Sequence, residues 1–373
     1  MNCRNTKSRM VGRLVVVLVF LAAAAVADDG PAHRLELQRP VLLGVSGGNI
    51  EDFSSAFCCS GTLGGLVEDA DGKLYVLSNN HVLGRTNQGL PGEAILQPGL
   101  IDQEVACLQD AGDTVAQLTR FVPISFKRGS TNVVDAAIAE IVPGRVDPSG
   151  AILDIGTVAS ETAQAFVGQA VTKSGRTTGR TFGEVLAIDV TVDVAYTKEC
   201  GLGRRQVARF VRQILVGPAD FSAGGDSGSL VVEDADVDPR PVGLLFAGSE
   251  TSTLVNPIDD VLVSLCVAMR GASSFPDPAA CSSGGGGGGG PGKGKKKGVG
   301  GPFGIAAAVK ARHEQELLDL PGVVGAGLGL DRSGRPTIEV YLARATSPAR
   351  AALPRSLEGI PVRAVETGVF YAR

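Results

Sequence analysis

Short apolar runs separated by Gly, Pro, Asn and Asp restrict the fold of this chain more than any other feature. Runs of this length with such punctuation indicate strands. No long segment with helical spacing occurs before Asp259–Met269, which is predicted to be a closing helix. The sequence therefore predicts an all-β barrel or sandwich. The runs lie at Ser60–Val67, Lys73–Leu77, Val133–Ile141, Glu184–Val194, Gln213–Val216, Ser229–Val232 and Val242–Phe246.

Seven consecutive glycines followed by a lysine cluster mark a boundary near the C-terminal end of this β-rich region. Residues 282–301 hold too few apolar side chains for a core, so they are predicted to form a flexible linker. The linker divides a large domain (40–270) from a small α+β accessory domain (303–373), and we expect the large domain to fold without the small one. In the small domain a helix is predicted at Ile305–Leu320 and strands at Val323–Leu330, Thr337–Leu342 and near Ile360–Val365.

The N-terminal residues have the pattern of an export signal. Basic residues precede a short apolar run, and Ala25-Val26-Ala27 is typical of a cleavage site, so residues 1–27 are predicted to be a signal peptide. An uncleaved membrane anchor is the alternative, but the run is shorter than a bilayer span requires. Six cysteines follow the signal. In a secreted or periplasmic protein they predict disulfide bonds, whose connectivity the sequence leaves open.

Neither the charge distribution nor the motifs predict a cofactor, a metal site or nucleic-acid binding. Residues 291–373 carry 13 Lys and Arg against 7 Asp and Glu, but a short lysine cluster is more typical of a solvated linker than of a nucleic-acid site. No CxxC pair or histidine cluster suggests zinc. Gly325–Gly329 lacks the spacing of a nucleotide loop. After cleavage of the signal, no membrane association is expected.

The strongest chemical signal is the segment Gly224–Ser229, which reads Gly-Gly-Asp-Ser-Gly-Ser between two predicted strands. Acyl transfer requires a hydroxyl in a tight turn whose backbone N–H groups point at the developing oxyanion, and glycines permit such a turn. Ser227 is therefore the candidate nucleophile, with the amides of Gly225 and Ser227 as the oxyanion hole. An ordinary glycine-rich loop is the competing interpretation.

A nucleophilic serine needs a base, and His81 is the candidate. The chain has three histidines, and His81 is the one that lies within the large domain. It follows the predicted strand Lys73–Leu77 through the polar residues Ser78-Asn79-Asn80. This position places an imidazole at the end of a strand, where it is able to face a neighbouring loop.

The third member must be a carboxylate that fixes the imidazole tautomer. Asp135 is flanked by small and apolar residues, a context that suggests a buried side chain, and a buried carboxylate requires a partner. Asp113 and Asp102 are rivals in segments that resemble solvated loops. The chain order His81, Asp135, Ser227 is that of chymotrypsin and not that of subtilisin or the α/β-hydrolases.

Together these segments resemble the chymotrypsin-fold serine peptidases, in detail bacterial secreted members similar to the plant narrow-leaf-type trypsin-like proteins. The resemblance implies two six-stranded β-barrels with the active site between them, and a serine endopeptidase that acts on protein or peptide substrates. A catalytically silent protein-binding module on the same fold is the alternative. The segments that carry the resemblance are Ser60–Gly64, Ser78–Leu83, Val134–Ala137, Lys173–Gly179 and Gly225–Ser229.

Several positions depart from the trypsin pattern. No Ile-Val-Gly-Gly sequence marks an activation cut, so Asp226 lacks the usual new N-terminus as a partner and the need for zymogen cleavage stays open. Phe221 stands where trypsins have an acid, which argues against a preference for Arg or Lys. Glutamate-specific relatives use a pocket histidine, and this domain has none besides His81. The predicted pocket consists of Phe221, Phe246, Ala247 and Gly248, with a small or apolar P1 residue as the default expectation.

Overall fold

The computed structural model describes residues 32–277, 281, 302–344, 346 and 348–372. The predicted signal peptide and the predicted linker lie outside the described residues. In the described ranges no helix has the length and apolar character needed to cross a membrane.

Six strands close the first barrel, one of which is bent into two halves at Gly64. The first half of this strand, β2, pairs with β1, and its second half, β3, pairs with β4. The other strands lie between these two pairings in the order β4-β7-β6-β5-β1. Gly64 is required at the bend, because an added Cβ would lie 1.8 Å from the carbonyl oxygen of Gly228. The strands are β1 (Val45–Asn49), β2 (Gly61–Leu63), β3 (Gly65–Glu68), β4 (Leu74–Ser78), β5 (Ala94–Leu96), β6 (Thr114–Phe121) and β7 (Ala137–Ile141).

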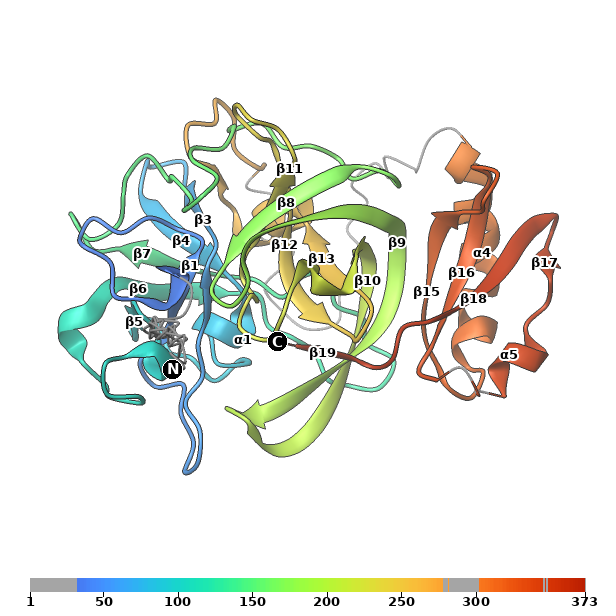
Figure 1. The fold of residues 1–373 in the computed structure, drawn as a ribbon, viewed down its shortest axis with the longest axis horizontal. Coiled ribbons are helices and arrows are strands. Elements are labelled where there is room, and N and C mark those ends of the chain that lie inside the picture. Colours follow the sequence, from blue (N-terminus) through green and yellow to red (C-terminus); the bar gives the residue numbers. More distant parts are fainter. Residues whose placement is uncertain (1–31, 278–280, 282–301, 345, 347, 373) are drawn as a thin grey trace, which may run out of the picture. The chain divides into compact units, whose positions relative to one another are not determined.

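The second barrel is a closed ring of six antiparallel strands in the order β8-β9-β10-β13-β12-β11, with β11 pairing back to β8 (Figure 1). Closure pairs each strand of the ring with two neighbours within it. The predicted architecture of two six-stranded barrels is confirmed. The strands are β8 (Ala170–Gly175), β9 (Gly179–Glu199), β10 (Leu202–Gly217), β11 (Leu230–Glu233), β12 (Pro241–Gly248) and β13 (Thr253–Pro257).

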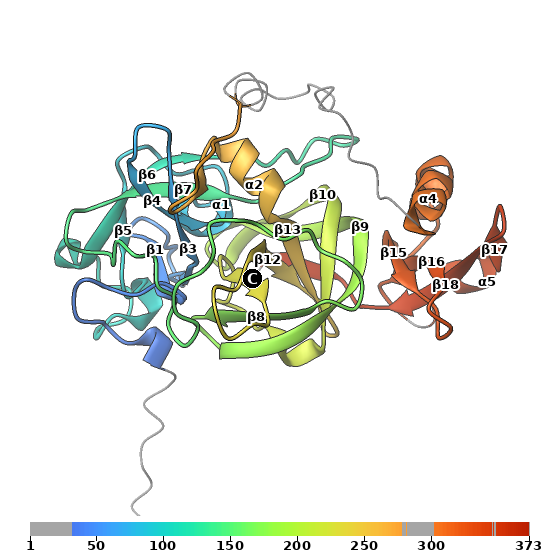
Figure 2. The ribbon, with the colours of Figure 1, turned by 90° about the horizontal axis from the view of Figure 1, so that it is seen from above.

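The short helix α1 (Asn80–Leu83) follows β4, and α2 (Ile258–Leu265), labelled in Figure 2, follows β13. The apolar face of α2 packs into the core of the first barrel. The helix ends earlier than predicted, because Cys266 adopts left-handed backbone angles (φ 51°). The chain then forms β14 (Ala268–Met269), which pairs with β3.

The C-terminal part contains the predicted helix and strands, but its strands are not separate from the second barrel. Strand β15 pairs antiparallel with β9, and β19 pairs with both β9 and β12. These C-terminal strands therefore extend the sheet of the second barrel, while the domain boundaries and the independent folding of the large domain stay predictions. The elements are α4 (Pro302–Leu318), β15 (Val323–Leu330), β16 (Pro336–Leu342), α5 (Ala349–Ala352), β17 (Ser356–Leu357), β18 (Ile360–Glu366) and β19 (Phe370–Ala372).

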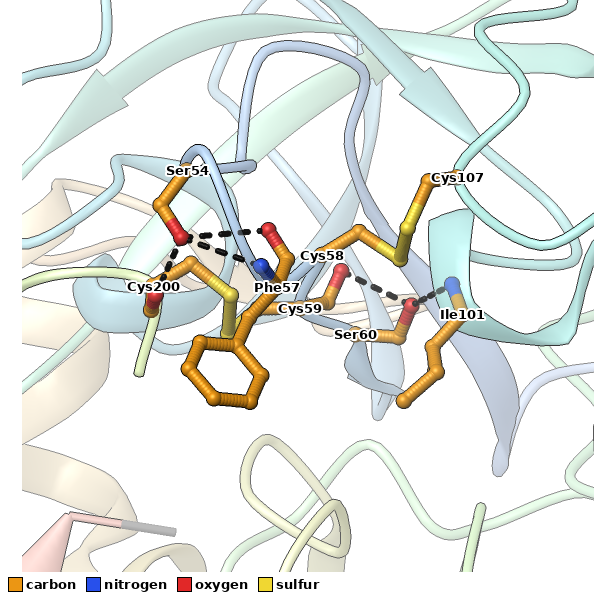
Figure 3. The surroundings of a disulfide bond; sticks show 8 residues. All are labelled: Ser54, Phe57, Cys58, Cys59, Ser60, Ile101, Cys107 and Cys200. Carbon is orange, nitrogen blue, oxygen red and sulfur yellow. Dashed lines mark hydrogen bonds between the residues drawn. A yellow bond between two sulfur atoms is a disulfide. The ribbon is translucent and has the colours of Figure 1, made fainter. Parts of the chain in front are cut away.

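Two disulfides give the neighbouring cysteines of the first barrel separate partners, as expected from the strain of a ring between adjacent cysteines. Cys58 bonds to Cys107, and Cys59 bonds to Cys200 (Figure 3). Cys200 lies in the turn between β9 and β10, so the second disulfide ties that long hairpin to the first barrel.

Candidate active site

His81 and Asp135 are in direct contact, as the sequence predicts. The Nδ1 atom of His81 lies 2.6 Å from Oδ2 of Asp135, and the backbone N–H of His81 donates to Oδ1 at 3.1 Å. The Asp135 side chain has no exposed surface, whereas the His81 side chain is 12% exposed. A proton on Nδ1 is the arrangement that this contact favours, and it leaves Nε2 free of a proton and able to act as a base.

Three further side chains hold Asp135 in place. The hydroxyl of Tyr196 donates to Oδ2 at 2.9 Å, the side-chain oxygen of Asn256 accepts from the Asp135 N–H at 3.0 Å, and the Asn79 amide donates to the Asp135 carbonyl at 2.7 Å. Burial, and then the charge of Asp135, raise the pKa of Tyr196 well above its ordinary value. Tyr196 therefore stays a neutral donor, and the buried carboxylate is well compensated.

These bonds also explain why β7 begins at Ala137 and not at Val133 as predicted. The backbone N–H of Asp135 bonds to a side chain and its carbonyl accepts from Asn79. Neither group is available to a neighbouring strand, so the segment around Asp135 lies outside the ladder.

Ser227 lies in the predicted tight turn. The two glycines around it have positive φ, 100° at Gly225 and 95° at Gly228, which side chains with a Cβ rarely adopt. The Oγ of Ser227 donates to the carbonyl of Phe246 at 3.2 Å. Within the described part of the chain, the N–H groups of Gly225 and Ser227 donate to no protein acceptor. Both amides are thus available to an external oxygen, which an oxyanion hole requires.

Thr62 joins the segment that carries Ser227 to the segment that carries His81. Its N–H donates to the Ser227 carbonyl at 2.8 Å, and its own carbonyl accepts from the hydroxyl of Ser78 at 2.7 Å. An added Cβ at Gly228 would lie 2.1 Å from that hydroxyl. The turn after the nucleophile and the end of the strand before the histidine are therefore in direct contact, and the structure brings the three predicted residues into one region.

Asp226 is held by a lysine of the same chain. The Nζ atom of Lys173 lies 3.4 Å from Oδ2 of Asp226, and neither side chain has any exposed surface. Burial lowers the pKa of Lys173, and the Asp226 carboxylate opposes this effect. Asp226 also accepts from the N–H groups of Thr177 (2.7 Å), Thr178 (3.2 Å) and Ala223 (2.9 Å) and from the Thr178 hydroxyl (2.7 Å). The turn that carries Ser227 is thus fixed without any newly formed N-terminus.

Sequence reasoning missed Tyr196, Asn256 and the role of Lys173. A signal was available for Lys173, because a lysine amid the apolar and small residues of a strand requires a buried partner. No local pattern distinguishes Tyr196 or Asn256, whose contacts join segments distant in the sequence.

The predicted pocket residues are buried. Phe221, Phe246 and Ala247 have no exposed surface. The Phe221 side chain packs in a core cluster with Val216 and Val255, and the Phe246 side chain packs in another with Tyr196. Phe246 reaches Ser227 through its carbonyl oxygen and not through its ring.

Asp52 adds a second carboxyl group near the candidate site. Burial raises its pKa to about 7, against the opposing charges of His81 and Arg85. In the described ranges Asp52, Cys59 and Cys200 are the one group of three potential metal ligands. The two sulfurs are joined in a disulfide, so this group offers a metal only a single carboxylate.

A family model described as the Nal1 C-terminal domain matches residues 132–256, which include Asp135 and Ser227 but not His81. A search of curated proteins found no match.

Several solved serine proteases are similar in structure. One, described as glutamic acid-specific with a histidine triad in substrate binding, is 22% identical, with a TM-score of 0.41 over 61% of this chain and 100% of that chain. Nocardiopsis protease is 15% identical, with a TM-score of 0.41 over 62% and 98%. Cellulomonas bogoriensis chymotrypsin is 17% identical, with a TM-score of 0.39 over 61% and 97%. Each of these similarities covers about three fifths of this chain, and the roles of its residues rest on their geometry alone.

Proposed function

We propose that the protein is a secreted serine endopeptidase in which Ser227, His81 and Asp135 form the catalytic triad. The observation that carries this proposal is the buried contact between Asp135 and Nδ1 of His81, on a segment that touches the turn of Ser227. An orienting carboxylate, a base and a serine in a glycine turn are the parts that acyl transfer requires.

The proposed chemistry has the steps of acyl transfer by a serine triad. The Ser227 Oγ attacks the carbonyl carbon of the scissile peptide bond, and its proton passes to Nε2 of His81. The N–H groups of Gly225 and Ser227 stabilise the oxyanion, and Asp135 stabilises the imidazolium. His81 then gives its proton to the leaving amine, which departs and leaves an acyl-enzyme. A water molecule, deprotonated by His81, then attacks the acyl carbonyl, and His81 returns the proton to the Ser227 Oγ as the bond to the acyl group breaks and the acid product leaves.

Three finer points belong to the same proposal. The disulfides support export to an oxidising compartment. Phe221, in place of an acid, supports a small or apolar P1 residue over Arg or Lys. Lys173 supports an enzyme that is assembled without zymogen cleavage, because it supplies the cation that pairs with Asp226.

The test is covalent labelling with a fluorophosphonate probe, which requires an activated serine, alongside cleavage of a peptide library. We expect labelling of the parent and of the control Ser130→Ala, and none of Ser227→Ala or His81→Ala, with an unchanged melting temperature for Ser227→Ala. Labelling of Ser227→Ala at the parental rate would contradict the assignment. A folded parent that resists the probe and cleaves no peptide would instead indicate a catalytically silent binding module.

A further inference from the structure

The last three described residues of the chain form β19, which pairs with the C-terminal end of β12 (Figure 1). On one side, Ala247 and Gly248 pair with β13. On the other side they pair antiparallel with β19, Ala247 opposite Ala372 and Gly248 opposite Tyr371. Strand β11 pairs with β12 only as far as Leu244. Without β19, the edge at Ala247 and Gly248 would therefore be open.

This edge leads directly to Ser227. Phe246 precedes Ala247, and its carbonyl accepts the hydrogen bond from the Ser227 Oγ at 3.2 Å. Because the pairing is antiparallel, a chain on this edge runs toward Phe246 as it runs toward its own C-terminus. One further residue beyond the position opposite Ala247 brings a peptide opposite Phe246. A peptide that acylates Ser227 must approach with this polarity, its N-terminal side on the edge and the reacting carbonyl just beyond.

We propose that β19 is an intramolecular inhibitor, which occupies the edge of β12 that an extended peptide substrate has to pair with. An exposed strand edge binds an extended peptide by adding it as a further strand, which gives main-chain hydrogen bonds independently of sequence. Substrate and β19 compete for the same backbone groups of Ala247 and Gly248. The inhibitory role rests on the proposed function of Ser227, whereas the binding of the segment to the edge does not.

The contacts of β19 hold it in place with a small number of pairs. Phe370 is fully buried in the cluster that contains Phe246 and Ala247. Phe370 and Tyr371 also pair in parallel with β9, and the Arg205 guanidinium lies 5.6 Å from the centre of the Tyr371 ring. Ser227 itself has no exposed surface in this state. Strand β19 forms only two residue pairs with β12 and two with β9. Such a short strand is suited to displacement by a substrate and not to permanent occupation of the edge.

The expected size of the inhibition follows from tethering. A tethered segment acts at an effective concentration of about 1 mM, so if the free peptide binds with a Kd of about 0.1 mM, removing it should raise kcat/KM about tenfold. The increase should appear mainly as a lower KM, because β19 competes with substrate and leaves the reacting groups unchanged.

The first experiment compares the mature chain with a variant that lacks residues 369–373. We expect the truncated protein to cleave peptides and to react with the fluorophosphonate probe about tenfold faster. A free peptide with the sequence of residues 369–373 should inhibit it competitively. The control is Val237→Ala in the full chain, which alters a side chain that is 76% exposed and outside this segment and should leave turnover unchanged. Equal turnover of the truncated and full chains, without inhibition by the peptide, would overturn the proposal.

A second measurement separates this proposal from the proposed activity. A fluorescent form of the peptide is added to truncated protein that also carries Ser227→Ala, and binding is read as anisotropy. We expect binding, and none for the same peptide N-methylated at the positions of Tyr371 and Ala372, because one of two successive residues in an antiparallel pair must donate to its partner strand. If no variant cleaves peptides, binding still supports occupation of the edge, and absence of binding refutes it.

Should the truncated chain fail to fold, Ala372→Pro in the full chain decides the matter. Proline removes the N–H of residue 372 and disfavours the strand, while the buried Phe370 is retained. Turnover above that of the parent supports the proposal. If the Ala372→Pro variant unfolds as cooperatively as the parent and its turnover equals that of the parent, the inhibitor proposal is refuted.

Discussion

Replacing Lys173 with methionine tests whether an internal ion pair builds the active-site turn. The substitution preserves the length of the side chain and removes its charge, which leaves the buried Asp226 carboxylate without its cation. Removing one partner of a buried pair costs about 3 to 5 kcal/mol. Asp226 keeps its four other donors, from Thr177, Thr178 and Ala223. We therefore expect the free energy of unfolding to fall by about 3 kcal/mol, the low end of this range.

Activity should fall together with stability, because the donors to Asp226 flank the turn that carries Ser227. A displacement of about 1 Å at a reacting group costs about a hundredfold in rate. Denaturant unfolding measures the free energy of unfolding of each variant, and peptide turnover measures its kcat/KM. The matched control is Lys73→Met, since Lys73 lies 3.6 Å from Glu140 with both side chains about half exposed, and it should cost less than about 0.5 kcal/mol.

The double variant Lys173→Met with Asp226→Asn completes the test. Once the carboxylate is an amide, the loss of the lysine no longer leaves a buried charge, so the double variant should cost less than the sum of the single variants. The reasoning is refuted if Lys173→Met costs less than about 1 kcal/mol, or if the two costs simply add.

Three further outcomes follow from individual contacts. Tyr196→Phe removes a donor from Asp135 and should cost about 1.5 kcal/mol or more in denaturant unfolding. The less compensated carboxylate should also shift the pH at half-maximal activity upward. Asp52, whose pKa burial raises to about 7, binds a proton more tightly in the folded state than in the unfolded state. Stability should therefore fall as pH rises from about 4 to 7, and Asp52→Asn should flatten this slope. Cys266 and Cys281 are both free cysteines, and burial, followed by the effect of the Cys281 thiol, raises the pKa of Cys266 to about 11. Oxidation should join them, detectable by mass spectrometry, with a gain of about 3 kcal/mol for this loop length.

The parts of the fold that local patterns determine were predictable from the sequence. Strand β15 has the predicted bounds, Val323–Leu330, and β18 extends the predicted strand by one residue. The contact between His81 and Asp135 also follows from local context, because an acid amid small apolar residues requires a partner. Such features are encoded within a few neighbouring positions, where periodicity and burial are directly visible.

Other features depend on pairings across the whole chain and carry no local signal. Strand β19 has three residues, too few for a periodic pattern, and only its register with β12 and β9 gives it a place. The glycine run predicts a linker, but it says nothing about contacts formed beyond it. An edge strand accepts any chain with free backbone groups, so the pairing of β15 with β9 could not be read from composition.

Strand β9 explains how these distant features act on one site. One edge of β9 pairs with β10, while the other pairs in turn with β8, β15 and β19. Its outer part carries Tyr196, the donor to Asp135, and its turn carries Cys200, bonded to Cys59 of the first barrel. Tyr371 pairs with Ala195, the residue before Tyr196. Strand β19, which covers the edge of β12, is therefore also a neighbour of Tyr196, the donor to Asp135. Displacement of β19 by a substrate therefore changes the support of the triad as well as access to it, and the Tyr196→Phe and truncated proteins should show non-additive effects on kcat/KM.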